Sequence, residues 1–251
     1  MLTHVSIKTR LILYLACFAL FLALKDRDFT FLFAAIVAVI SAVTAEAVIV
    51  YFKTKTFQIT ESAIITGLIV GYVLSSDEAW FKFVFASLLA ILSKHVIRFQ
   101  KRHLFNPAAF GIFLTIILLG APTQWKGTYL WYIVAPAGFY FVYKIRKTEI
   151  IIGYAIAFLV LFGTQAVLQK VSLSGIFGYL SYFYIFVMVI EPKTTPTRAA
   201  GKLLFGAGVV VLIFILTQTG IKLDVELLSL LAMNAIAPLL NKLSQKKRGV
   251  I

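Results

Sequence analysis

Two polar stretches interrupt an otherwise apolar sequence, and they carry the residue types that could do chemistry. One is Asn106-Pro107, which follows a basic run from Lys94 to His103, and the other begins with Glu191-Pro192 and ends at Arg198. Asn is a favoured helix N-cap and Pro a favoured first helical residue, so a helix is predicted to begin at Asn106-Pro107. Pro192 prevents the helix before it from continuing, which marks a helix end at Glu191.

Three helix starts are predicted to face the same side of the protein, near Thr60, Asn106 and Thr195. A helix N-terminus carries partial positive charge and unpaired N–H donors, which suit carboxylate, phosphate or an acceptor-rich ring. The pattern therefore predicts a polar pocket for an anionic or acceptor-rich ligand. The alternative is simple capping, because Ser, Thr, Asn and Pro begin many helices that bind nothing.

Glu46 lies within a long apolar segment, where a carboxylate is costly and usually faces protein or water. It is a candidate ion or proton site, and the alternative is that it pairs with a nearby lysine or reaches the interface. Glu191 has a similar alternative, as an interfacial residue paired with Arg198 or Lys94.

Asn234 and Pro238 lie in the last apolar segment. Proline frees the carbonyl four residues earlier, so this helix is predicted to open locally at Asn234, as a cavity lining or as a structural kink. The glycine pairs Gly67/Gly71 and Gly206/Gly208 are predicted to allow close helix packing.

The composition is that of an all-α polytopic membrane protein, with 61% hydrophobic and only 14% charged residues over 251 positions. The net charge of +14 does not indicate nucleic acid, because the basic residues lie in short loops between apolar segments. One cysteine, Cys17, excludes an iron–sulfur cluster held by this chain alone, and the three histidines show no metal-ligand spacing.

About ten transmembrane helices are predicted from the apolar segments. They span roughly residues 11–24, 29–52, 58–75, 80–98, 106–121, 128–144, 149–168, 173–190, 199–218 and 223–241. The third and eighth are short enough to be broken or tilted. With an even number of spans, 18 of the 24 lysines and arginines fall on the side of both termini. The positive-inside rule then predicts cytoplasmic termini in a multi-pass cell membrane protein, the inner membrane in a two-membrane cell.

The segments also divide into two halves of five, residues 1–122 and 123–251. Because five is odd, the halves would be inverted relative to each other, as two five-helix repeats of a single membrane domain. Asn106-Pro107 is then matched by Asn234 and Pro238.

Four stretches resemble one protein family, the membrane subunits B of the sodium-pumping NADH:quinone reductase (NqrB) and D of the Rnf electron-transport complex (RnfD). They are residues 60–68, TESAIITGL; Lys94-His95-Val96 with 105–109, FNPAA; 188–197, MVIEPKTTPT; and 233–238, MNAIAP. Their order and spacing cover nearly the whole chain. The third stretch has Glu191 where the family has Asp.

The resemblance implies a ten-helix fold of two inverted repeats and a riboflavin or FMN held non-covalently. The cofactor-binding residues it implies are Thr60, Ser62, Thr66, Lys94, Asn106, Pro107, Glu191, Thr194, Thr195 and Asn234. Lys94 would balance the charge of a reduced flavin. The family also attaches an FMN to a threonine in an external Ser-Gly-Ala-Thr motif, which this sequence lacks, so covalent FMN is not expected.

The leading hypothesis is a flavin-binding membrane subunit of an electron-transport oxidoreductase, in which the protein positions the flavin and tunes its potential. Its expected partners are membrane lipid and other membrane or flavoprotein redox subunits, with quinone as a further candidate and coupling to ion translocation as a further role. The rival hypothesis is a transporter or channel for a small solute, such as a flavin, built on the same fold. A third hypothesis is an inert scaffold subunit.

Overall fold

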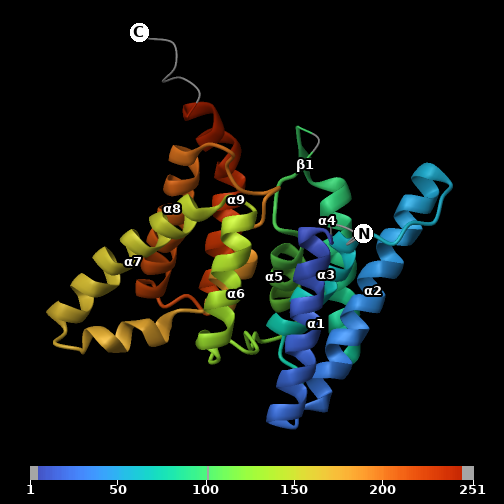
Figure 1. Ribbon diagram of the computed structural model, residues 1–251, viewed down its shortest axis with the longest axis horizontal. Helices are drawn as coiled ribbons and strands as arrows, with labels where there is room; N and C mark the ends of the chain where they lie inside the picture. Colours follow the sequence, from blue (N-terminus) through green and yellow to red (C-terminus); the bar gives the residue numbers. More distant parts are fainter. Residues whose placement is uncertain (1–4, 101, 245–251) are drawn as a thin grey trace. The chain divides into compact units, whose positions relative to one another are not determined.

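A computed structural model describes residues 5–100 and 102–244 and shows an all-α polytopic membrane protein (Figure 1). Its helices in this part of the chain are α1 (Ile7–Asp26), α2 (Phe29–Thr54), α3 (Glu61–Val73), α4 (Trp80–Val96), α5 (Pro107–Leu119), α6 (Trp131–Lys144), α7 (Thr148–Leu168), the 3-10 helix η1 (Leu173–Tyr179), the π-helix η2 (Tyr184–Met188), α8 (Ala199–Gln218) and α9 (Val225–Leu243). Among them, α1, α2, α7, α8 and α9 are long and apolar enough to cross a membrane.

The nine α-helices of the described residues coincide with nine of the ten predicted segments. Several begin at a capping side chain. In four of these helices a side chain before the first turn accepts a hydrogen bond from a main-chain N–H three residues later. These pairs are Ser6 with Thr9, Asp28 with Phe31, Thr60 with Ala63, and Asp224 with Leu227. The cytoplasmic placement predicted for the chain ends concerns residues 1–4 and 245–251, which lie outside the described residues.

The chain divides into two compact units. The first unit contains residues up to 103 and residues 107–127, and the second contains residues 104–106 and the chain from Thr128 onward. The division into inverted repeats at residue 122 stays a prediction.

In the first unit, two glycines let α3 approach α2 closely. A Cβ added to Gly67 would lie 2.5 Å from the Cα of Val39, and one added to Gly71 would lie 2.6 Å from the Cα of Ala35. The predicted packing role of this glycine pair is confirmed, because any side chain there would push the two backbones apart.

A small hairpin follows α4 and was not predicted (Figure 1). Strand β1 (Arg98–Phe99) pairs antiparallel with β2 (Arg102–His103), and Gln100 in the turn has a positive φ of 46°. The fourth helix therefore ends at Val96, two residues before the predicted end. Strands of two residues are too short to give an alternating pattern of polar and apolar residues, so the sequence of this stretch indicated its positive charge but not a hairpin.

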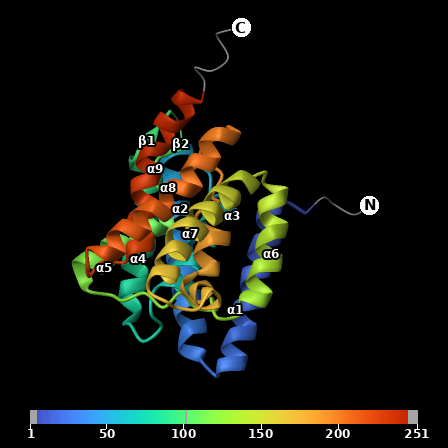
Figure 2. The same ribbon diagram turned by 90° about the vertical axis from the view of Figure 1, so that its left-hand side faces the viewer.

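In the second unit, the eighth predicted segment is not one α-helix. Residues 173–190 instead form η1 and the π-helix η2, separated by residues 180–183. This agrees with the prediction that the segment is broken. By contrast, α7 and α8 run side by side (Figure 2), and a Cβ on Gly206 would lie 2.0 Å from the carbonyl oxygen of Ile150. Close packing is thus confirmed at Gly206 as well.

Outside the membrane-spanning segments, an ion pair joins the start of α2 to the loop after α5. The Asp28 carboxylate accepts from Lys126 Nζ at 2.6 Å, from the Thr30 hydroxyl at 2.6 Å and from the Phe31 N–H at 2.9 Å. Partial burial would raise the pKa of Asp28, but these bonds outweigh it and lower the pKa from 3.8 to about 2. Partial burial would also lower the pKa of Lys126, yet its pairing with Asp28 and Asp26 raises it.

The Asp28→Asn variant is expected to lower the free energy of unfolding by about 1–2 kcal/mol at pH 7, since Asn can still cap α2. The folded pKa of Asp28 lies below the unfolded value, so its contribution is present above pH 3.8 and is lost as the pH falls towards about 2. Thermal unfolding in detergent from pH 2 to 7 measures this. The difference between wild type and variant should disappear at the acid end; a difference that is constant over the whole range would contradict the assignment.

Candidate functional site

The ten residues predicted to bind a cofactor fall in both units. Thr60, Ser62, Thr66, Lys94 and Pro107 belong to the first unit, and Asn106, Glu191, Thr194, Thr195 and Asn234 belong to the second. The two sets are described separately.

In the first unit, the polar residues of α3 make local bonds. The Thr60 hydroxyl oxygen accepts from the Ala63 N–H at 3.2 Å, and the Thr66 hydroxyl donates to the Ser62 carbonyl at 2.8 Å. Glu61 accepts hydrogen bonds from the hydroxyls of Ser6 and Thr9. These contacts are typical of a capped helix start, which is the alternative that the sequence left open. Each hydroxyl still has capacity for a further hydrogen bond.

Glu46 has two basic partners. Its carboxylate lies 2.8 Å from Lys94 Nζ and 3.0 Å from His95 Nε2, and the side chains of Glu46 and Lys94 are only 5% and 10% exposed. Lys53 Nζ lies 3.1 Å from the other ring nitrogen of His95. The structure thus joins two predicted residues, Glu46 and Lys94, that the sequence had assigned to different roles.

Pro107 is the first residue of α5, as predicted, while Asn106 directly before it packs within the second unit. The main-chain N–H of Asn106 donates to Asn234 Oδ1 at 2.8 Å, and its side-chain amide donates to the Met188 carbonyl at 3.3 Å. The two asparagines that the proposed repeat matched to each other are therefore in direct contact.

Asn234 extends this network to the stretch after η2. Its side-chain amide donates to the Thr194 carbonyl at 3.4 Å, and Asn234 and Asn106 are 0% and 2% exposed. α9 continues as an α-helix through Pro238, and the local opening predicted at Asn234 stays a prediction. The side chain of Asn234 holds a neighbouring segment.

The residues after η2 form a turn in which Glu191, Thr194 and Thr195 contact one another. The Thr194 hydroxyl donates to the Glu191 carboxylate at 3.4 Å, and the Thr195 hydroxyl donates to the Glu191 carbonyl at 2.7 Å. Thr194 and Thr195 are 4% and 3% exposed. Main-chain groups of this turn lie outside any helix, so buried hydroxyls, a carboxylate and peptide groups meet in one place.

Two buried lysines in this unit were missed. Lys147 Nζ donates to the Pro196 carbonyl at 2.9 Å, and Lys202 Nζ donates to the Arg146 carbonyl at 2.7 Å and to the Glu149 carboxylate at 3.1 Å. Lys147 ties the turn between α6 and α7 to the stretch before α8, and Lys202 ties α8 to the same turn and to the start of α7. The sequence could have indicated Lys202, because a lysine within an apolar span usually has a specific partner.

Ser229 was also missed. Its hydroxyl is fully buried on α9 and has no hydrogen-bond partner within the described part of the chain. A buried polar group without a partner costs about 1–3 kcal/mol, so a polar atom of a bound molecule would stabilise it. Ser229 lies about 7.5 Å along the helix axis from Asn234, five residues at 1.5 Å each.

The second-unit residues offer hydrogen-bonding groups of the types that a flavin ring can bind. An isoalloxazine ring presents hydrogen-bond donors and acceptors along one edge, and buried threonine hydroxyls can both donate and accept. Asn106 and Asn234 already bond to the protein, which suits them to position the turn. Among residues 5–100 and 102–244, no group of three or more His, Cys, Asp and Glu is arranged to hold a metal ion.

A family model described as the NQR2, RnfD, RnfE family matches the sequence twice, over residues 3–131 and residues 118–249. Together the two matches cover almost the whole chain. A comparison with curated proteins finds no match.

Proposed function

Because the chain belongs to the NQR2, RnfD, RnfE family, we propose that it is a membrane subunit of an electron-transport complex that holds a riboflavin or FMN without a covalent bond. The observation that supports this most is the buried network of Asn106, Asn234 and Thr194 beside the turn after η2. The bound flavin would supply one-electron and two-electron chemistry. The expected partners are other redox subunits, with quinone as a candidate acceptor.

In this proposal the residues of the second unit have two different tasks. Asn106 and Asn234 are positioning residues, because their amides hold the main chain on either side of the turn. Thr194, Thr195 and the Glu191 carboxylate would contact the polar edge of the ring, and Ser229 would gain the partner that it lacks. The five first-unit residues, Thr60, Ser62, Thr66, Lys94 and Pro107, stay candidate contacts, and Lys94 would have to share its charge with Glu46.

The first test is an absorption spectrum of the detergent-purified protein between 300 and 550 nm, before and after acid precipitation. We expect a flavin band near the visible end of this range that moves into the supernatant with the released cofactor. A colourless protein from cells with ample flavin would contradict the proposal. Labelled flavin that exchanges across liposomes without any reductant would favour the rival transporter hypothesis.

The Ser229→Ala variant gives a sharper test. Removing a hydroxyl that has no protein partner should leave the thermal stability of the flavin-free protein unchanged or higher, while flavin retention falls by about fivefold to tenfold, since one hydrogen bond is worth about 1 kcal/mol. Ser87→Ala is the matched control, because the buried Ser87 hydroxyl already donates to the Ala38 carbonyl at 3.0 Å. The control should lose stability and keep flavin. The opposite pattern would remove Ser229 from the site.

A further inference from the structure

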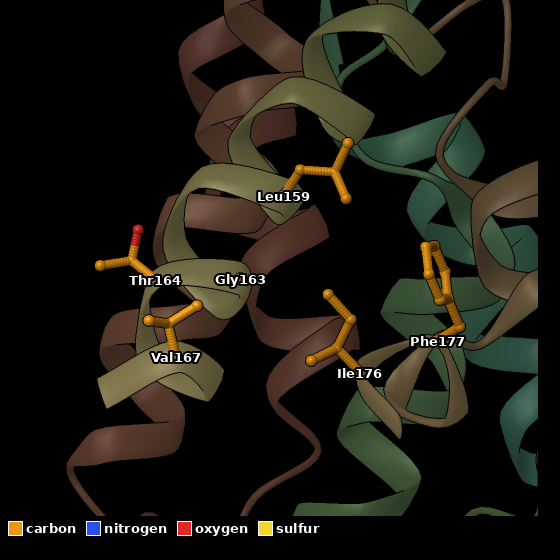
Figure 3. Close-up of a pocket in the computed structure, with 6 residues that line it drawn as sticks. All are labelled: Leu159, Gly163, Thr164, Val167, Ile176 and Phe177. Atoms are coloured by element: carbon orange, nitrogen blue, oxygen red, sulfur yellow. The ribbon is translucent and has the colours of Figure 1, made fainter. Parts of the chain in front are cut away.

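A groove of about 560 Å³ lies between α7 and η1 in the second unit (Figure 3). It is lined by Leu159, Gly163, Thr164, Val167, Ile176 and Phe177. Leu159 and Ile176 point into the space between the two helices, whereas the Thr164 side chain points away from η1 (Figure 3). The Thr164 hydroxyl donates to the Val160 carbonyl, so the groove presents almost only carbon to a ligand.

Two glycines of α7 show that this space is open on one side of the helix. A Cβ added to Gly153 would lie 2.1 Å from the Leu203 carbonyl oxygen, because α8 packs against that position. A Cβ added to Gly163 would meet no atom within 4 Å, although Gly163 has little exposed surface. The protein therefore leaves a gap at Gly163 that its own side chains do not fill.

The groove opens beside exposed apolar residues of α7. α7 is a 21-residue apolar helix, about 31 Å long, which is enough to cross the hydrocarbon core. Leu159 and Val167 line the groove and are 52% and 63% exposed, whereas Val160, which is 58% exposed, does not line it. In a helix that crosses the membrane, such exposed apolar residues are the ones that lipid can reach, which would give lipid chains access to the groove.

A second cavity of about 540 Å³ shares Phe177 with the groove. It is lined by Thr128, Tyr129, Trp131, Phe177, Gly178, Leu180 and Tyr182. Aromatic rings with a polar tip are the side chains favoured at the boundary between hydrocarbon and headgroups. An aromatic, partly polar cavity thus adjoins an apolar groove, which matches an amphipathic molecule with a polar end and an alkyl chain.

Neither water nor empty space is a favourable content for the groove. Water needs two to four polar partners, which this lining does not offer, and an empty gap forfeits dispersion contacts of its lining atoms. A flexible alkyl chain from the adjoining bilayer would make dispersion contacts with the lining atoms without burying any polar group.

We propose that the groove between α7 and η1 holds one acyl chain of a bilayer phospholipid, with the ester end of that lipid in the adjoining aromatic cavity. This lipid would occupy the space beside η1 where the eighth segment does not continue as an α-helix. It would therefore act as part of the second unit, independently of any flavin.

The test uses full-length protein equilibrated with dioleoyl phosphatidylglycerol, washed in detergent until bulk lipid is removed, and analysed for phospholipid per protein by mass spectrometry. Wild type should retain about one phospholipid per chain. Gly163→Trp and Gly163→Leu should retain at least about fivefold less, because each side chain fills the gap that the acyl chain would occupy and displaces buried methylenes. Val160→Trp, on the exposed lipid-facing surface of the same helix, is the matched control and should retain as much as wild type.

Three results would overturn the proposal. The first is that wild type retains no phospholipid. The second is that Gly163→Leu melts like wild type and keeps the same amount of lipid. The third is that the retained molecule is an isoprenoid compound instead of a phospholipid. If Gly163→Trp fails to fold, the smaller Gly163→Leu variant and the wild-type stoichiometry still decide the question.

Discussion

Replacing Asn234 with alanine is expected to lower the free energy of unfolding by about 3–5 kcal/mol. The variant leaves two buried main-chain groups without their partner, the Asn106 N–H and the Thr194 carbonyl, and each orphaned group costs about 1–3 kcal/mol. The lost side chain also leaves a small cavity in a fully buried position. Chemical unfolding in detergent, followed by far-ultraviolet circular dichroism, measures the loss.

Asn241→Ala is the matched control on the same helix. Asn241 Oδ1 also accepts from a main-chain N–H, that of Thr197 at 3.0 Å, but Thr197 is exposed and water can replace the bond. The control should therefore cost about 1 kcal/mol or less. Equal losses in the two variants would show that the Asn106–Asn234 network contributes no more to the free energy of unfolding than an exposed hydrogen bond does.

The same pair of variants separates stability from flavin binding. Asn234→Ala should also lose flavin, because Asn234 positions the turn at Thr194, whereas Asn241→Ala should keep it.

The helices were predictable because their signals are local. Long apolar segments, the helix start predicted near Thr60 and Pro107 at a first helical position are each recognised from a few neighbouring residues, and the structure places helix starts at Thr60 and Pro107. The fold class and the family were predicted correctly for a different reason, since composition and motif order extend over the whole chain.

The partners of polar residues were not predictable in this way. Glu46 is separated from Lys94 by 48 positions and Asn106 from Asn234 by 128, so no local pattern shows that they touch. The effect of Pro238 on its helix also depends on the surrounding packing, and α9 continues through it as an α-helix. Ser229 looked like an ordinary residue of an apolar helix, since only its surroundings reveal a missing partner.

The second large effect is expected at Glu46. Replacing it with glutamine should lower the free energy of unfolding by about 3–5 kcal/mol, because the nearly buried Lys94 ammonium loses its counter-charge. Breaking one side of a buried ion pair costs more than removing both charges. The double variant Glu46→Gln, Lys94→Met should therefore recover most of the lost stability.

A second ion pair in the same unit provides the control. Glu78 and Lys82 also pair at the start of α4, and the Glu78 side chain is 20% exposed against 5% for Glu46. Glu78→Gln should cost about 1 kcal/mol or less, since water can solvate the remaining lysine. If Glu46→Gln were no more harmful than Glu78→Gln, Glu46 would not be the structural counter-charge of Lys94. That result would favour the proton or ion site predicted for Glu46, because its charge would be available for a ligand.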